Sequence, residues 1–154
     1  MGYLQGINPI RSTTMSLNTS VAGSGTASNA SATILVGRVL LSILFILSGF
    51  AKLTAISATA QWFGSIGLPL PTAAAVGSGL LEFFGGLAIL VGFQTRIVAI
   101  VLAIFTLAAT AVAHLNFADQ MQMLMLQKNL GLTGGFLLLA ALGAGAYSVD
   151  AKRG

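Results

Sequence analysis

Three side chains that can form ion pairs or carry protons lie inside or at the end of apolar runs: Lys52, Glu82 and His114. Glu82 lies near the middle of the run 72–92, about ten residues from either end, or about 15 Å along a helix. An ionised carboxylate in such apolar surroundings must be protonated, paired or placed in a wet cavity. Lys52 and His114 are its expected partners, because both close an apolar run and helical side chains lean toward their own N-terminus.

These residue types suit hydrogen bonding to a carbonyl oxygen and proton transfer. Lys52 and His114 can donate hydrogen bonds to a quinone carbonyl, while Glu82 can hold Lys52 in its charged form and carry a proton. Asn129 is placed in the same candidate site and is also expected to cap the helix that starts there. A second interpretation stays open, in which the polar side chains only tie helices together. No residue is assigned as catalytic.

Helical spacing places the candidate residues on two faces. Five residues follow one another at intervals of four, three, four and three positions: Arg38, Ser42, Phe45, Gly49 and Lys52. A second face contains Arg96, Ala103, Thr110 and His114. If both faces turn inward, the chemically active side chains gather near one end of a helical bundle.

Metal chemistry has little support in the sequence. The chain has no cysteine and one histidine, so it cannot by itself build a thiolate site or a bis-histidine haem. The alternating thioethers Met121, Met123 and Met125 are a weak alternative, a Cu(I) site. Methionine is also a common apolar filler, which explains the same pattern without a metal.

The composition indicates the elements that must position these residues. Of 154 residues, 56% are hydrophobic and 6% are charged, whereas a soluble domain has about a quarter charged. The chain therefore reads as an all-α integral membrane protein in the lipid bilayer, and its few cations exclude a nucleic-acid partner. A helical span needs about 20 residues, and four runs qualify, at about 34–54, 72–92, 97–114 and 129–147.

The remaining segments complete the expected organisation. Residues 1–33 form a Ser/Thr/Gly-rich tail that we expect to be flexible, 34–150 form a four-helix transmembrane bundle, and 151–154 form a basic end. Arg38 and Lys52 are expected to snorkel to opposite interfaces, and Arg38 and Arg96 to have structural or topological roles. Most cations lie on the side of the termini, so the positive-inside rule places both termini in the cytoplasm.

Two further features bear on a cavity. Gly79, Gly85 and Gly86 surround Glu82 and leave room for a helix or a ligand to approach closely. Trp62 and Phe63, followed by the turn 67–71, suggest an interfacial anchor that could also cover a cavity.

The ordered motifs resemble the DoxX family of small bacterial inner-membrane proteins. They are Gly37-Arg38, Ser48-Gly49-Phe50-Ala51-Lys52, the Gly-Leu-Pro-Leu-Pro of 67–71, the stretch from Glu82 to Arg96, His114, Lys128-Asn129-Leu130, Gly134-Gly135 and Tyr147 to Asp150. Together they cover about residues 34–150. The long tail departs from the compact form of the family.

The resemblance implies a four-helix bundle in the bacterial inner membrane, with some relatives linked to redox work as subunits or partners of quinone, thiol or superoxide systems. We expect a membrane subunit of a quinone-linked redox system, not an enzyme on its own, with a polar site near the outer leaflet. A bound quinone is the expected cofactor. The alternative is an accessory or assembly subunit, docked to a larger respiratory or photosynthetic complex through the N-terminal tail.

Overall fold

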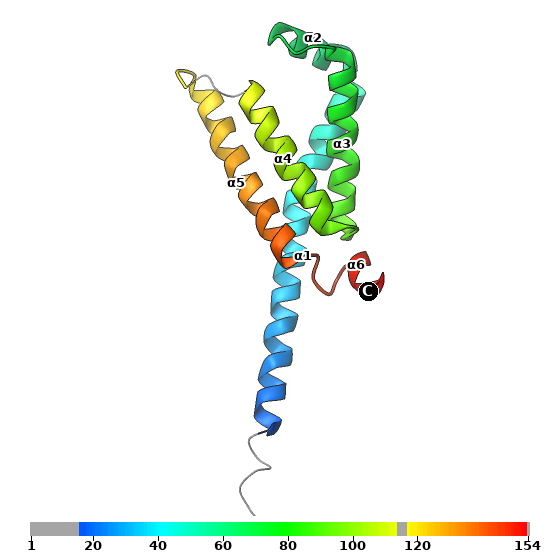
Figure 1. The fold of residues 1–154 in the computed structure, drawn as a ribbon, viewed down its shortest axis with the longest axis vertical. Coiled ribbons are helices and arrows are strands. Elements are labelled where there is room, and N and C mark those ends of the chain that lie inside the picture. Colours follow the sequence, from blue (N-terminus) through cyan, green and yellow to red (C-terminus); the bar gives the residue numbers. More distant parts are fainter. Residues whose placement is uncertain (1–15, 114–116, 154) are drawn as a thin grey trace, which may run out of the picture.

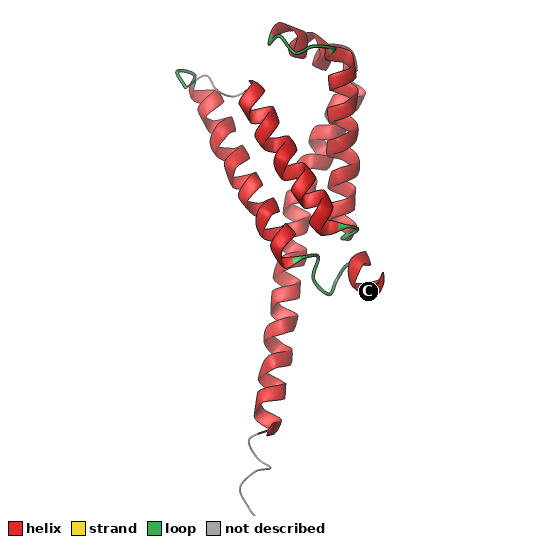
Figure 2. Ribbon diagram, in the orientation of Figure 1, coloured by secondary structure: helices red, strands yellow, loops and turns green. Residues whose placement is uncertain are grey.

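A computed structural model describes residues 16–113 and 117–153, and this part of the chain is built from helices joined by short loops (Figures 1 and 2). The helices are α1 (Ser16–Thr54), α2 (Ile56–Ser65), α3 (Pro71–Val91), α4 (Thr95–Ala113), α5 (Gln120–Leu142) and α6 (Val149–Arg153). Ser28–Thr54 of α1 and the whole of α3, α4 and α5 are long and apolar enough to cross a membrane. The prediction of an all-helical fold with four candidate spans is confirmed.

The four long helices pack as two pairs, α1 with α3 and α4 with α5. In Figure 1 the pairs lie close together where α3 turns into α4, and they diverge toward the end that carries α2. Both ends of the described chain lie on the side opposite α2. We call the end with the α3–α4 turn the base of the bundle, and the α2 end the open end.

Glycines allow α1 and α3 to touch along their backbones. A Cβ atom on Gly49 would lie 2.7 Å from the carbonyl oxygen of Gly79, and one on Gly86 would lie 2.8 Å from the side chain of Ile46. Such distances are too short for real side chains, so these glycines permit the close approach. The contact brings the last turn of α1, with Lys52, beside the middle of α3.

Gly49→Ala is expected to lower the free energy of unfolding by about 1–3 kcal/mol, because the new methyl group would have to push the α3 backbone away. Gly37→Ala on the same helix is the matched control, since nothing lies within 4 Å of its Cβ position. The control should be neutral or slightly stabilising, because alanine favours helices. Unfolding of both variants in detergent measures the difference, and equal stabilities would contradict the close packing.

The observed helices differ from the expected ones in the first span, in the connection to the second span and at both ends of the last span. The first helix begins at Ser16, so the backbone of 16–33, which was expected to belong to the tail, is helical. This stretch contains no proline, and extending a helix costs much less than starting one. The short helix α2, between the first two spans, was not predicted. α5 begins nine residues before the predicted start at 129 and ends at Leu142, not at 147.

Asp119, not Asn129, caps α5. The Asp119 side chain accepts hydrogen bonds from the backbone N–H groups of Met121, at 2.8 Å, and Gln122, at 3.4 Å. At the other end, Gly143 has a φ of 84°, a left-handed conformation that glycine adopts easily and that ends the helix. The predicted cap at Asn129 is therefore wrong, and Asn129 lies inside α5.

Arg38 holds the base of the bundle together. Its guanidinium donates hydrogen bonds to the carbonyl oxygens at the end of α3, Ile89 at 2.9 Å and Leu90 at 2.6 Å, and beyond α5, Ala144 and Tyr147 at 2.8 Å each. The side chain is 1% exposed. The expected snorkelling of Arg38 to an interface is therefore wrong, because carbonyl groups inside the protein bind the cation.

Arg96 connects the start of α4 to the end of α5. It donates hydrogen bonds to the carbonyl oxygens of Ala140 and Ala141, at 2.9 and 2.7 Å, in the last turn of α5. Arg96 is exposed, so it does not belong to the inward face of α4 on which the sequence had placed it. That face instead contains Thr95, Ala99, Leu102, Ala103, Thr106 and Thr110.

Asp150 attaches the C-terminal segment to the start of α4. Its carboxylate accepts hydrogen bonds from the backbone N–H groups of Gln94 and Thr95, at 2.7 and 2.8 Å. Burial raises the pKa of Asp150, but the hydrogen bonds from Thr95 and Gln94 and the charge of Arg153 outweigh it, so the pKa lies below its ordinary value. Ionised Asp150 therefore stabilises the folded state. This contribution is fully present above the ordinary carboxyl pKa, and it is lost as the pH falls through the lowered pKa of Asp150 in the folded protein.

Candidate functional site

A cavity of about 520 Å³ lies between the two helix pairs, and α2 borders it. Its wall is mostly apolar, with polar side chains from both pairs. The polar lining residues are Ser48, Lys52, Ser78, Glu82, Thr106, Lys128 and Asn129. A cavity of this size lies within the usual range for small-molecule sites, about 300–1,000 Å³.

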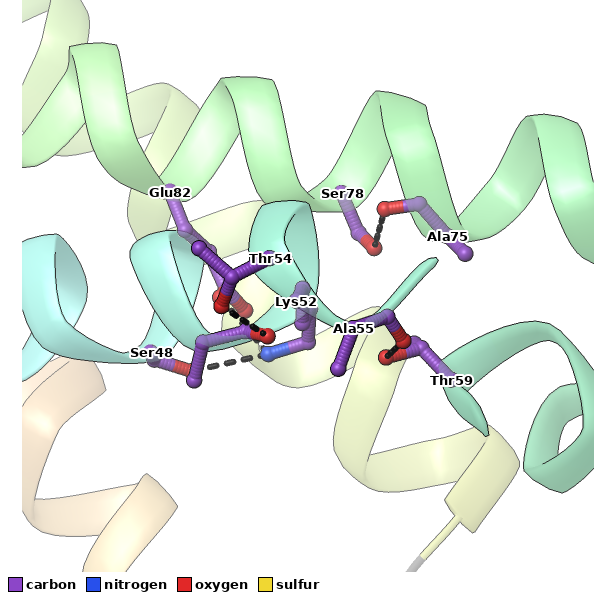
Figure 3. A network of polar contacts seen from close by, with 9 residues as sticks. Ser48, Lys52, Thr54, Ala55, Thr59, Ala75, Ser78 and Glu82 are labelled. Atoms are coloured by element: carbon purple, nitrogen blue, oxygen red, sulfur yellow. Dashed lines mark hydrogen bonds and ion pairs between the residues drawn. The ribbon is translucent and has the colours of Figure 1, made fainter. Parts of the chain in front are cut away.

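Lys52 and Glu82 form an ion pair on the wall made by α1 and α3. The Lys52 Nζ atom lies 2.7 Å from Glu82 Oε2 and donates a second hydrogen bond, at 2.8 Å, to Ser48 Oγ (Figure 3). The two side chains are 22% and 9% exposed, so water reaches the pair only in part. The pairing that the sequence predicted for Glu82 is confirmed.

The predicted face of α1 positions this pair. Arg38, Ser42, Phe45 and Gly49 are buried along one side of the helix, and Lys52 is half-buried in the same row. Ser48 was missed by the sequence reasoning, although it lies four residues before Lys52 and therefore one helical turn away. An ammonium group has three N–H donors. Within the described part of the chain, Ser48 and Glu82 use two of them.

A second polar cluster lies on the wall made by α4 and α5. Asn129 Nδ2 donates a hydrogen bond to Thr110 Oγ1 at 2.8 Å, and Thr110 Oγ1 donates to the Thr106 carbonyl oxygen at 2.7 Å. Thr106 Oγ1 in turn bonds to the Leu102 carbonyl oxygen at 2.7 Å. Thr106 was not singled out from the sequence, but it lies one turn before Thr110, which was.

α2 contributes the aromatic residues that were expected near a membrane interface. Trp62, Phe63 and Ile66 line the cavity, and the Trp62 and Phe63 rings lie 5.3 Å apart. The side chain of Phe63 is buried, whereas Trp62 is 44% exposed. The segment therefore borders the cavity at the open end, as the sequence had suggested.

Two candidates from the sequence remain, His114 and the methionine group. His114 lies outside the described residues. Met121, Met123 and Met125 lie on α5, where a step of two residues turns the side chain by about 200°. Met123 therefore points away from the other two, and the three thioethers do not converge as a Cu(I) site requires.

The site can bind a molecule that is largely apolar and has a hydrogen-bonding head. The apolar lining favours a lipophilic body, while the free N–H of Lys52 and the amide of Asn129 can bind polar atoms. The Glu82 carboxylate keeps Lys52 charged and oriented, and it is itself an acceptor for a hydroxyl group.

Comparisons with known proteins identify a family and several relatives. The profile of the DoxX family matches residues 33–115. The chain is 48% identical over 120 residues to inner membrane protein YqjF of Escherichia coli, covering 76% of this chain and 88% of YqjF. It is 32% identical over 125 residues to inner membrane protein YphA of the same organism, covering 77% and 89%.

A third relative has a name that mentions an activity. The chain is 34% identical over 79 residues to the Bacillus subtilis protein named "Putative oxidoreductase CatD", covering 51% of this chain and 58% of that protein. No solved structure gives a significant match to the chain.

Proposed function

Since the chain belongs to the DoxX family of membrane proteins, we propose that it is an inner-membrane subunit that binds a quinone in the cavity between its two helix pairs. The observation that carries the proposal is the Lys52–Glu82 ion pair, which lies on the wall of an otherwise mostly apolar cavity. An ionisable pair inside a membrane domain is costly, which favours a functional role.

The chemistry of the cavity suits a quinone. A quinone reaches the site through the bilayer, because its tail is lipid-soluble, and its carbonyl oxygen accepts a hydrogen bond from the third N–H of Lys52. Glu82 fixes the ammonium group in place for that bond. The name of CatD supports a redox connection for one relative.

Electrons would be exchanged with a partner protein. Reduction of a quinone to a quinol takes two electrons and two protons. With no cysteine and one histidine, this chain offers few ligands for a redox centre of its own. We therefore propose a partner oxidoreductase that carries the redox cofactor and supplies the two electrons, while the two protons come from water. In this chain Lys52 donates a hydrogen bond to the quinone carbonyl, and Glu82 accepts one from the quinol hydroxyl.

The N-terminal half of α1 favours a second candidate function, an accessory subunit of a larger membrane complex. In Figure 1 this half extends far beyond the base of the bundle, away from the other helices. An extended helix of this kind can dock to a partner. Under this function the polar cavity would only stabilise the bundle.

Mass spectrometry of the protein purified in its native lipids distinguishes these functions. The wild type is expected to retain a quinone, and Glu82→Gln should retain about tenfold less, because the neutral amide no longer holds Lys52. Asp119→Asn is the matched control, since it neutralises an acid outside the cavity and asparagine also caps helices. Co-purification of a large complex without any quinone would favour the accessory subunit.

We further propose that both termini are cytoplasmic, which places the cavity near the outer leaflet. Because the chain has no cysteine, single cysteines report on topology directly. A membrane-impermeant maleimide added to spheroplasts should label Ser65→Cys on α2 and leave Lys152→Cys unlabelled; both residues are exposed. The reverse pattern would overturn this orientation.

A further inference from the structure

We propose that the quinone ring bridges the two helix pairs, with one carbonyl at Lys52 and the opposite carbonyl at Asn129. The site would then select rings with two oxygens at opposite ends, the 1,4-quinones and their quinols. This inference rests on the proposed function. It adds a ligand contact at Asn129, whereas the proposed function needs only a quinone bound at Lys52 and Glu82.

The two polar clusters belong to different structural units. Lys52, Ser48 and Glu82 lie on the α1–α3 pair, whereas Asn129, Thr110 and Thr106 lie on the α4–α5 pair. Lys52, Glu82, Thr106 and Asn129 all line the one cavity between the pairs. No hydrogen bond or ion pair joins the two clusters within the described part of the chain, so a ligand can connect them.

The clusters lie at similar distances from the first residues of their helices. Glu82 is eleven residues after the start of α3, and Asn129 is nine residues after the start of α5. With a rise of about 1.5 Å per residue, these positions are about 16 Å and about 14 Å along their helices. Both side chains line the same cavity, so a ring bound in it lies between the two clusters.

Hydrogen bonding fixes the orientation of the Asn129 amide. The single proton of the Thr110 hydroxyl goes to the Thr106 carbonyl oxygen, so Thr110 can only accept from Asn129. This assigns the NH₂ group of Asn129 to the Thr110 side. One N–H and the amide oxygen then remain without a partner among the described residues.

Each wall therefore offers both a donor and an acceptor. Lys52 and the remaining N–H of Asn129 can donate to the two carbonyl oxygens of a quinone. The Glu82 carboxylate and the Asn129 amide oxygen can accept from the two hydroxyl groups of the quinol. The same four groups bind both redox forms, as a site for a redox carrier requires. Phe45, Phe63 and Phe105 line the cavity and suit a flat ring between them.

Binding can be measured with the single tryptophan of the chain. Trp62 lines the cavity, and quinones quench tryptophan fluorescence at short range. The probe is decyl-1,4-benzoquinone, added to the full chain in lipid nanodiscs, and a decyl-cyclohexenone with one carbonyl is the competitor. The wild type should bind the dicarbonyl probe about tenfold more tightly than the competitor.

Asn129→Leu should remove this preference, and Thr133→Val is the matched control. Thr133 is buried on the same helix, but its hydroxyl bonds only to the Asn129 carbonyl oxygen of the backbone. The comparison of two ligands on the wild type needs no variant, so it stays decisive if Asn129→Leu folds poorly.

The outcomes separate the two proposals. Equal affinity of the wild type for both ligands, or unchanged quinone binding by Asn129→Leu, would overturn the bridge and leave the quinone site at Lys52 and Glu82 standing. Absence of saturable binding of either ligand would overturn the quinone function itself, and the bridge with it.

Discussion

Lys52→Met is expected to lower the free energy of unfolding by about 3–5 kcal/mol and to abolish saturable quinone binding. The substitution leaves the Glu82 carboxylate, 9% exposed, without its counter-charge in apolar surroundings. Loss of one partner of a buried pair costs more than loss of both, because the remaining charge has to be desolvated alone. The double variant Lys52→Met/Glu82→Met should therefore recover most of the stability.

The double variant separates the two roles that the ion pair can have. If the pair serves a ligand, the double variant is folded but does not bind quinone. Lys128→Met is the matched control, because this lysine also lines the cavity but is exposed and has no ion-pair partner among the described residues. Unfolding in detergent gives the stabilities. A double variant that is as unstable as Lys52→Met would contradict the account of the pair.

Arg38→Met should destabilise the bundle by a similar amount, about 3–5 kcal/mol. The substitution removes four hydrogen bonds and leaves the carbonyl oxygens of Ile89, Leu90, Ala144 and Tyr147 without their donor. Two of these groups end α3 and two follow α5, so the base of the bundle loses the hydrogen bonds that join α1 and α3 to the segment after α5. The segment after Leu142 should become accessible to protease.

Arg96→Met is the control for this prediction. Arg96 also donates two hydrogen bonds to carbonyl groups of α5, but at an exposed position where water can replace them. Its loss should cost about 1 kcal/mol and should not release the C-terminal segment. Thermal unfolding and limited proteolysis of both variants provide the test. If the two substitutions lower the stability equally and expose the C-terminal segment equally, Arg38 does not stabilise the base more than Arg96 does.

The residues of the ion pair could be predicted from the sequence, because the cost of a charge inside an apolar run can be recognised from the neighbouring residues alone. A carboxylate in the middle of an apolar run needs a partner at the same depth, and the spacing of Arg38, Ser42, Phe45, Gly49 and Lys52 points to the helix that provides one. The number of spans follows equally directly from the length of the apolar runs.

The contacts that depend on tertiary structure could not be predicted in this way. Counting cations places Arg38 near an interface, but the carbonyl groups that bind it come from positions more than 50 and 100 residues away in sequence. Asn129 has the right type for a helix cap, yet Asp119 begins the helix earlier and frees Asn129 to face the cavity. α2 was missed because a short apolar helix resembles an interfacial loop.

A fluorescence titration of Trp62 tests the central claim, a quinone site at the Lys52–Glu82 pair, most directly. Decyl-1,4-benzoquinone is added to the wild type and to Lys52→Met/Glu82→Met in lipid nanodiscs at the same protein-to-lipid ratio. We predict saturable quenching of the wild type, and for the double variant only the weak, linear quenching of a quinone dissolved in the bilayer. Identical saturable curves for the two proteins, or linear quenching of both, would contradict the claim.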